Sequence, residues 1–338
     1  MPICIERERP RQFSAQIDEA LEIVHNEFSG LDPYRQYRNA FARLLKTDPL
    51  GRVYMMGTDQ RDLFVPELRR VIGDSVPAGG GHIFDFGAGD GQTFALVAAA
   101  VPTGTVVSIE EPNPHYVEDY WAFLATQAHL RAGVSLTAGF DGLDKSAAEQ
   151  GVVLPADGSI DLVLAMHMLY FVSDVPASLA RMVRFLKPGG SAFVVVTDET
   201  IGYTGLAMKH YRERGGRVGD AGRSLELMSE RRRLFGKGGQ GSAGIVAALQ
   251  AAGLPVQAEV TLQPSRLYGH NLADLVALCA IAGLAGVEDL GKFDAAAALL
   301  REAPGSVDLR VEDQGPRAGM WSVLQPQWVA VIRAALRG

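Results

Sequence analysis

A short strand that runs directly into a glycine-rich turn constrains this chain more than any other feature of its sequence. Ile83 to Phe86 is apolar apart from one aspartate, and residues 87–91 follow as Gly-Ala-Gly-Asp-Gly. The apolar run from Thr93 to Val101 predicts a helix after the turn. This unit brings backbone close to a nucleotide-like ligand, because a Cβ at the turn positions would block the approach. No Gly-Lys-Ser/Thr follows, which excludes a P-loop.

An acidic pair ends the next predicted strand. Residues 105–110 run into Glu110, Glu111 and Pro112, and Glu111 lies roughly 20 residues beyond the glycines, where a carboxylate can accept both hydroxyls of a ribose. The turn and Glu111 together predict an adenosine-containing ligand. The alternative is a tight connection between a strand and a helix that binds nothing.

Alternating strand and helix patterns continue to about residue 200. The predicted strands are 82–86, 105–110, 134–138, 160–165 and 191–197, and helices between them include Val117–Arg131 and Val175–Leu186. Alternation of this kind indicates an α/β fold, a parallel sheet with helices on both faces.

The pattern is looser at both ends of the chain. Residues 12–72 are helical in pattern, with Tyr34, Tyr37 and Phe41 on one face. Arg231 to Arg233 read as a solvated helix end, and the glycines of 236–241 as a flexible link. The remaining predicted elements are a helix that Ser242 caps, a strand over Val256–Leu262, helical structure over 272–301, and one bent last strand over Trp321–Arg333 with Pro326 at an edge or bulge.

Net charge, cysteine content and the length of the apolar runs limit the kinds of partner that we expect for this chain. The net charge of −7 argues against broad binding of nucleic acid, and two isolated cysteines form neither a disulfide framework nor a metal site. The longest nearly apolar run, Leu275–Val287, is shorter than the roughly 20 residues of a membrane span, and the first residues have no apolar signal region. We therefore expect a soluble, cytoplasmic protein with no membrane or nucleic-acid partner.

The motifs resemble those of the class I S-adenosylmethionine (SAM) methyltransferases. The glycine spacing is Gly-x-Gly-x-Gly rather than the dinucleotide Gly-x-Gly-x-x-Gly, and Asp85 stands two residues before Gly87. More specifically, the chain resembles the histamine N-methyltransferase-like group of small-molecule enzymes. The segments that carry this resemblance are Ile109–Pro112, Ile160–Pro176 and Tyr34–Phe41, with Arg184–Gly190 typical of class I enzymes generally.

The resemblance implies a fold and a set of binding residues. It implies a Rossmann-like class I methyltransferase sheet with an N-terminal helical lid and a helical insertion before the last strand. The implied domains are the lid at 1–75, the SAM-binding core at 76–240 and the C-terminal strands at 241–338, with the insertion at about 271–318. The residues expected to bind SAM are Asp85, Gly87, Ala88, Gly89, Glu111, Asp141 and Met166.

Three further residues are candidates for catalysis. Tyr34 in the lid and Tyr170 after the fourth strand could form an aromatic wall beside the sulfonium, and His167 or Tyr170 could take a proton from the acceptor. The alternatives are that His167 packs beneath the adenosine and that the tyrosines only join lid to core. Asp141 has the alternative of a turn aspartate.

The predicted function is in-line methyl transfer from SAM to a small molecule, in specialised metabolism. Histamine itself is not expected, because only Asp48 is acidic where the group has its histamine-binding glutamate. One alternative is an enzyme that cyclises the aminobutyrate arm of SAM and releases methylthioadenosine; a second is a non-catalytic SAM-binding protein. The acceptor and the oligomeric state stay open.

Overall fold

The computed structural model describes residues 10–47, 53–213, 230–236, 241–284 and 291–336. The chain divides into two compact units, each assembled from three stretches of sequence. The first unit comprises Met1–Gln60, Thr197–Glu226 and Pro264–Gln327. The second comprises Arg61–Val196, Leu227–Gln263 and Trp328–Gly338.

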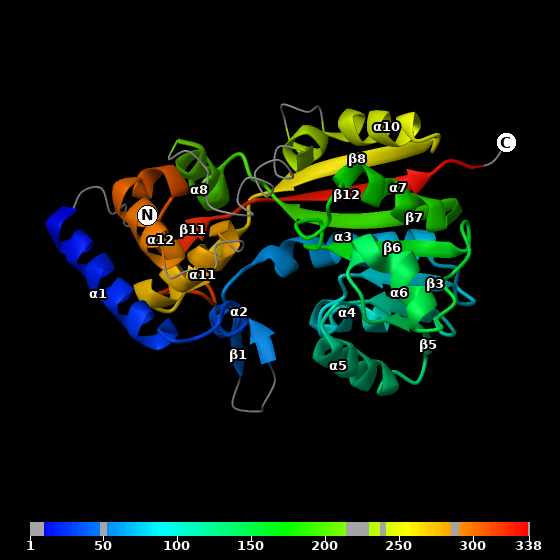
Figure 1. Ribbon diagram of the computed structural model, residues 1–338, viewed down its shortest axis with the longest axis horizontal. Coiled ribbons are helices and arrows are strands. Elements are labelled where there is room, and N and C mark those ends of the chain that lie inside the picture. Colours follow the sequence, from blue (N-terminus) through cyan, green and yellow to red (C-terminus); the bar gives the residue numbers. More distant parts are fainter. Residues whose placement is uncertain (1–9, 48–52, 214–229, 237–240, 285–290, 337–338) are drawn as a thin grey trace. The chain divides into compact units, whose positions relative to one another are not determined.

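A seven-stranded sheet forms the centre of the second unit, with strand order β5-β4-β3-β6-β7-β12-β8 (Figure 1). The strands are β3 (His82–Phe86), β4 (Val106–Glu110), β5 (Arg131–Leu136), β6 (Ile160–Met166), β7 (Leu186–Thr197), β8 (Val256–Gln263) and β12 (Gln327–Ala334). Strands β3 to β7 pair in parallel, so their carboxyl ends meet at one edge of the sheet. The predicted parallel α/β arrangement is confirmed.

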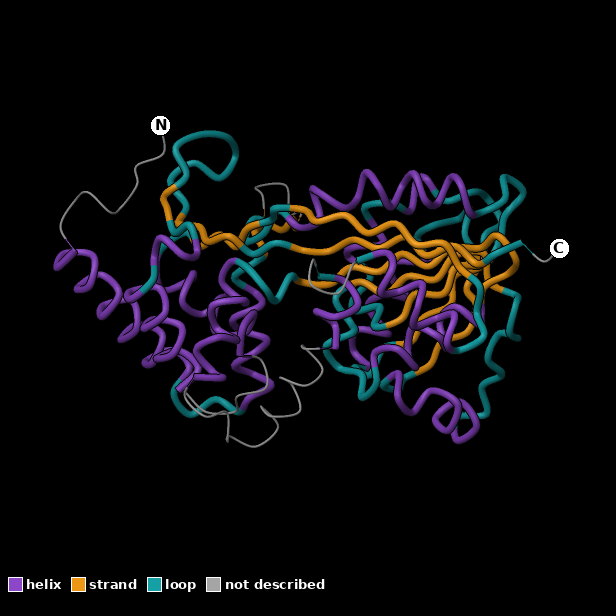
Figure 2. Tube along the Cα trace, turned by 90° about the horizontal axis from the view of Figure 1, so that it is seen from above, coloured by secondary structure: helices purple, strands orange, loops and turns teal. Residues whose placement is uncertain are grey.

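Helices cover both faces of this sheet, as Figure 2 shows. One face packs against α3 (Gln60–Ser75), α4 (Gln92–Ala95), the short 3-10 turn η2 (Ala98–Ala100) and α5 (Pro114–Ala125). The other packs against α6 (Leu143–Glu149), which follows the turn η3 (Phe140–Gly142), and against α7 (Val175–Phe185) and α10 (Ser242–Ala251). In β3, Ile83 joins the first core while Phe84 and Phe86 join the second, because successive strand residues point to opposite faces.

The first unit is mainly helical. Its elements are α1 (Pro10–Phe28), α2 (Pro33–Ala42), β1 (Leu45–Thr47), β2 (Val53–Met55), α8 (Gly202–Glu213), β9 (Arg266–Gly269), α11 (Leu272–Leu284), α12 (Gly291–Glu302), η5 (Pro304–Val307), β10 (Arg310–Val311) and β11 (Trp321–Leu324). The apolar faces of α1, α11 and α12 form one buried cluster, which includes Phe28, Leu275 and Phe293. Strands β10, β11 and β9 form a small antiparallel sheet, and β1 pairs with β2.

Capping residues in the sequence explain where several helices begin. Asp32 accepts a hydrogen bond from the backbone N–H of Arg35 at the start of α2, and Asp174 does the same for Ala177 at the start of α7. Each of these helices has proline in its first turn, where the missing N–H costs nothing.

Two predicted helices of the second unit end earlier than expected. The helix predicted over 117–131 stops at Ala125, because Thr126 turns its hydroxyl back onto the carbonyl of Phe123, and β5 begins at Arg131 instead of residue 134. The helix predicted over 93–101 breaks after Ala95 into short turns with i to i+3 bonds, such as Val97 N–H to Phe94 C=O.

Two expectations near the C-terminal end are also wrong. Ser242 lies inside α10, and Gly241 stands at its N-cap without a side-chain bond. The strand predicted over 321–333 is two strands of different sheets, β11 and β12. The break falls at Pro326, which has no N–H for a ladder and accepts a hydrogen bond from Asp198 N–H at 2.7 Å.

No helix among the described residues is long and apolar enough to cross a membrane.

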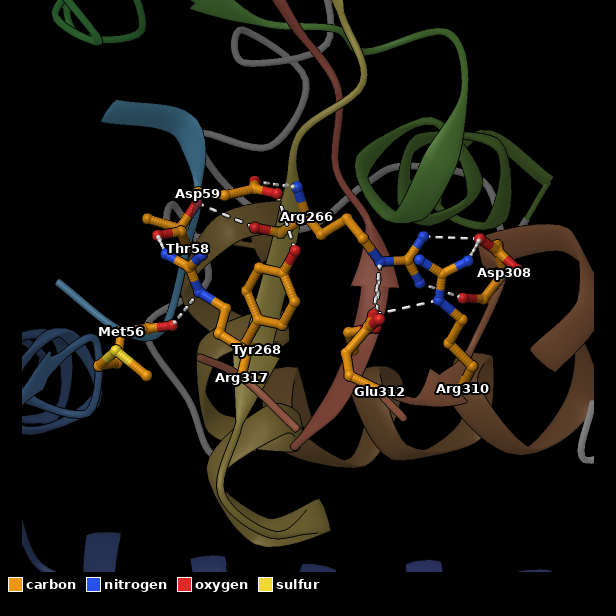
Figure 3. Close-up of polar contacts among 10 residues, drawn as sticks. Met56, Thr58, Asp59, Arg266, Tyr268, Asp308, Arg310, Glu312 and Arg317 are labelled. Atoms are coloured by element: carbon orange, nitrogen blue, oxygen red, sulfur yellow. Dashed lines mark hydrogen bonds and ion pairs between the residues drawn. The ribbon is translucent and has the colours of Figure 1, made fainter. Parts of the chain in front are cut away.

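A polar cluster around Arg266 joins several strands of the first unit (Figure 3). Its guanidinium donates to the Asp308 carboxylate at 2.6 Å and to Ser322 at 3.0 Å, and it lies 3.3 Å from Glu312. Its backbone N–H donates to Asp59, whose other oxygen accepts from Tyr268 at 2.7 Å. The Arg266 side chain is only 7% exposed, so these partners replace the water that would otherwise stabilise its charge.

Replacing Arg266 by Met should therefore destabilise the first unit. We expect a loss of about 3 kcal/mol, the lower end for breaking a buried ion pair, because Asp308 stays partly in water. Arg310 contacts the same two carboxylates but is 30% exposed, so Arg310→Met should cost about 0–1 kcal/mol. Urea unfolding followed by circular dichroism measures both, and equal losses would contradict the assignment.

Candidate functional site

The glycine turn is held by the two acidic residues at the end of β4. Gly87 N–H donates to the Glu110 carboxylate at 3.0 Å, and Gly89 N–H donates to the Glu111 carboxylate at 2.9 Å. Between them, Ala88 N–H donates to the backbone carbonyl of Glu110 at 3.0 Å. The turn after β3 and the acidic end of β4 therefore form one hydrogen-bonded structure at the carboxyl edge of the sheet.

Glycine is needed at positions 87 and 89 for two different physical reasons. Both have a left-handed backbone, with φ of 59° at Gly87 and 60° at Gly89. A Cβ on Gly87 would lie 2.4 Å from the Cβ of Met168, so this glycine is required by the packing of the protein itself. A Cβ on Gly89 would meet nothing within 4 Å among the described residues, so Gly89 leaves its backbone open to a ligand.

Burial makes the carboxyl groups of this edge easier to protonate. It raises the pKa of Asp85 to about 7, against the hydrogen bond that Tyr120 donates at 3.1 Å, and raises that of Glu110 to about 8. It also raises the pKa of Glu111. One oxygen of Asp85 has no hydrogen-bond partner among the described residues. Clustered carboxyls with spare acceptors favour a cationic ligand or one that carries hydroxyl donors.

The loop after β6 brings His167 and Tyr170 together. Nδ1 of His167 lies 3.0 Å from the Tyr170 hydroxyl, and the two rings stack 6.2 Å apart. His167 has a φ of 58°, a left-handed conformation that is uncommon outside glycine, and its backbone N–H donates to the Val195 carbonyl. Strain of this kind persists only where the surroundings enforce it, and it is frequent at functional sites.

Met166 and Asp141 flank that loop. Met166 ends β6 and packs partly buried against the core under α3, α4 and α5. Asp141 lies in η3, and both its oxygens accept from Ser173 N–H, at 2.8 and 3.1 Å. Asp141 therefore ties the end of β5 to the loop after β6, a contact that the sequence did not indicate.

The structure corrects the prediction that Arg231 is exposed to solvent. The expected solvated helix end lies in a helical segment, residues 230–235, and Arg232 and Arg233 are exposed as predicted. Arg231 is instead 4% exposed, with its guanidinium over the ring of Tyr170 and a hydrogen bond to the Leu169 carbonyl at 3.0 Å. Three adjacent arginines look alike in sequence, so nothing local distinguished the buried one.

The structure also adds residues that the sequence reasoning missed. Glu110 holds Gly87, and Tyr120 of α5 holds Asp85. Arg61, in the first turn of α3, lies near Asp90 of the glycine turn; burial lowers the pKa of Arg61 and the Asp90 carboxylate opposes that shift. Glu110 adjoins a recognised motif and could have been found, whereas Arg61 and Tyr120 are single residues on helices without a local signal.

The predicted site residues thus divide into two sets. Those of the second unit lie at or beyond the carboxyl ends of parallel strands, and β3, β4 and β6 end level in register, since Phe86 lies opposite both Glu110 and Ala165. Tyr34 belongs to α2 in the first unit, and its side chain, like Asp48, lies outside what the structure describes. On the same helix, the rings of Tyr37 and Phe41 do stack, 6.0 Å apart.

Comparison with known proteins identifies the family of this chain. A family described as a methyltransferase domain matches residues 34–234. The human thiol S-methyltransferase TMT1A is 27% identical over 138 residues, which is 41% of this chain and 50% of that protein, so the chain spans about half the length of this relative.

Two solved structures are similar at low identity. The YcgJ protein of Bacillus subtilis is 14% identical, with a TM-score of 0.47 over 81% of this chain and 100% of that one. An arsenic(III) S-adenosylmethionine methyltransferase from Chlamydomonas reinhardtii is 14% identical, with a TM-score of 0.40 over 78% of this chain and 67% of that one.

The family match covers more than half of the chain and includes the glycine turn, Glu111 and the loop after β6. The chain belongs to the methyltransferase-domain family.

Proposed function

We propose that this member of the methyltransferase-domain family is a SAM-dependent methyltransferase that acts on a small molecule in specialised metabolism, and that His167 and Tyr170 accept the proton that the acceptor loses. The observation that carries the proposal is the 3.0 Å contact between these two side chains, at the same edge of the sheet as the turn held by Glu111. A group that takes a proton needs a partner within hydrogen-bond reach, and this pair has that geometry.

The residues at the turn fit SAM. Glu111 already accepts from Gly89 N–H and, at 2.9 Å, from Asn113 N–H, one on each oxygen. Each carboxylate oxygen has a second lone pair, so Glu111 can still accept both ribose hydroxyls. Gly87, Ala88 and Gly89 let the backbone approach, and Asp85, which has an oxygen without a hydrogen-bond partner among the described residues, is available as an acceptor for SAM.

Two further contacts complete the proposed cofactor site. We assign Met166 to the adenine plane, because it ends β6 with its side chain only partly buried. We assign Asp141 to the adenine amino group, because its carboxylate accepts a single N–H and has lone pairs to spare.

Methyl transfer requires mainly that the methyl donor and the acceptor are aligned. SAM, when bound, supplies an already activated methyl group. The protein can contribute by holding the acceptor in line and excluding water, which can be worth about 7–11 kcal/mol. We propose that Tyr170 lines the reacting centre from the sheet edge and that Tyr34 lines it from the first unit, where each ring attracts a sulfonium by about 0.5–2 kcal/mol.

One family resemblance and one relative bear on the chemical class of the acceptor. We retain the resemblance to the histamine N-methyltransferase-like group as support for a small acceptor, with no preference for histamine. The human relative is named for thiol methylation, which adds thiols to amines and hydroxyl compounds as acceptors to be tested.

Product analysis tests the proposed reaction. Purified protein with SAM and a panel of thiols, amines and hydroxyl compounds should form S-adenosylhomocysteine and one methylated acceptor, identified by mass spectrometry. Methylthioadenosine formed from SAM alone, above the rate in buffer, would instead support the ring-forming alternative. Intact SAM binding with no product across the panel would favour the non-catalytic alternative.

SAM binding tests the role of Glu111. Glu111→Ala removes a buried charged acceptor and should weaken binding by about 2–3 kcal/mol, roughly 30- to 150-fold in Kd by calorimetry. Glu118→Ala, on an exposed position of α5, is the matched control and should bind like the parent. Thermal unfolding checks that the turn still folds. Parental affinity in Glu111→Ala would overturn the ribose assignment and leave Glu110 as the next candidate.

Hydrogen exchange tests the proposed lid. We propose that residues 12–50 cover the bound ligand, a closure that would exclude water from the reaction. Because Ile17, Val24 and Phe28 of α1 are already buried in the first unit, the new protection should appear mainly in α2 and in β1. Exchange with and without S-adenosylhomocysteine measures this, and equal exchange in both states would refute the lid.

A further inference from the structure

Arg231 has an environment that a surface arginine would not have. Only 4% of it is exposed, its Cζ lies 5.1 Å from the centroid of the Tyr170 ring, and one of its nitrogens donates to the Leu169 carbonyl at 3.0 Å. Removing a guanidinium from water is costly unless acceptors or an aromatic face replace the water. Here both replacements come from the loop that carries His167.

The helical segment 230–235 holds this loop at two places. Besides the bond from Arg231 to Leu169, the Glu230 carboxylate accepts from Val175 N–H at 3.1 Å. Asp141 holds the same loop through Ser173 N–H. These contacts hold the chain just after His167, whose φ of 58° is a conformation that persists only where the surroundings enforce it.

The position of the charge matters as much as the contact. A cation over the face of a phenol stabilises negative charge that develops on the ring and its oxygen. The Tyr170 hydroxyl faces His167 Nδ1, so a proton that leaves Tyr170 has an acceptor at 3.0 Å. Charged side chains that contact the loop include Arg231, Glu230 and Asp141.

We propose that Arg231 is a positioning residue that keeps Tyr170 in line as a proton relay between the acceptor and His167. In this step the acceptor's proton bonds to the Tyr170 oxygen while the Tyr170 proton moves to His167 Nδ1. The methyl group bonds to the acceptor atom, and the electron pair of the broken bond stays on the sulfur of the cofactor. This inference rests on the proposed function, because it requires an acceptor that loses a proton.

Two substitutions separate charge from packing. Arg231→Gln keeps a polar, planar amide but removes the charge over Tyr170, whereas Arg231→Lys keeps the charge and loses the planar group. Arg232→Gln removes the same charge from the exposed neighbouring position and is the control.

Nuclear magnetic resonance of 15N-labelled histidine gives a readout that needs no acceptor. In Arg231→Gln, His167 should take up its proton at higher pH than in the parent, because a repelling cation is gone. In Arg231→Lys and Arg232→Gln it should titrate at the parental position. Since no product is measured, a failure of this test is distinguishable from a failure of the proposed function.

Kinetics with the acceptor found by product analysis complete the test. Arg231→Gln should lower kcat by about ten- to a hundredfold, with the SAM Kd unchanged and the acidic limb of the pH–rate profile moved to higher pH. A folded, SAM-binding Arg231→Gln with parental kcat and parental His167 titration would overturn the proposal. If that variant does not fold, Tyr170→Phe must move the His167 titration while Arg231→Lys leaves it in place; either result failing would also overturn it.

Discussion

The hydrogen bonds between two carboxylates and the backbone of the glycine turn are the interaction on which the site depends. Glu110 and Glu111 end β4, and the N–H groups of Gly87 and Gly89 follow β3. Parallel pairing sets these two strand ends side by side, so the sheet itself delivers the carboxylates to the turn. The left-handed turn is then stabilised by the same side chains that are left with lone pairs for a ligand.

The sequence predicted the central sheet well and for a physical reason. Strands buried on both faces are short runs of apolar residues, and β3, β4 and β6 are such runs, bounded by glycine, proline or acid. Helix ends were predicted less well, because they depend on single residues: Thr126 bonds back to the Phe123 carbonyl, and Gly241 rather than Ser242 stands at the N-cap of α10. The split of β11 from β12 depended on which sheet each half joins, which no local pattern encodes.

In the candidate site, too, residues in contiguous motifs could be predicted from the sequence, whereas residues brought in by the tertiary fold could not. Gly87, Gly89 and Glu111 belong to a contiguous motif, and the contact between His167 and Tyr170 spans only three residues, so local sequence could indicate both. Arg231 reaches Tyr170 across a long stretch of chain, and only the tertiary fold distinguishes it from Arg232 and Arg233. Tertiary burial of one member in a run of like charges is the kind of information that composition and periodicity do not contain.

The place of β12 in the sheet has a consequence for how this chain acquires its structure. The strand lies between β7 and β8 although it follows both in sequence by many residues, and each compact unit is closed by a stretch that lies late in the chain. During synthesis, β7 and β8 are therefore made before their shared neighbour and present unpaired backbone edges, the kind of surface that invites association between chains. Such non-local pairing makes folding slow as well. β12 can join the sheet only after both of its neighbours have been made, and until then their open edges can pair with another copy of the chain.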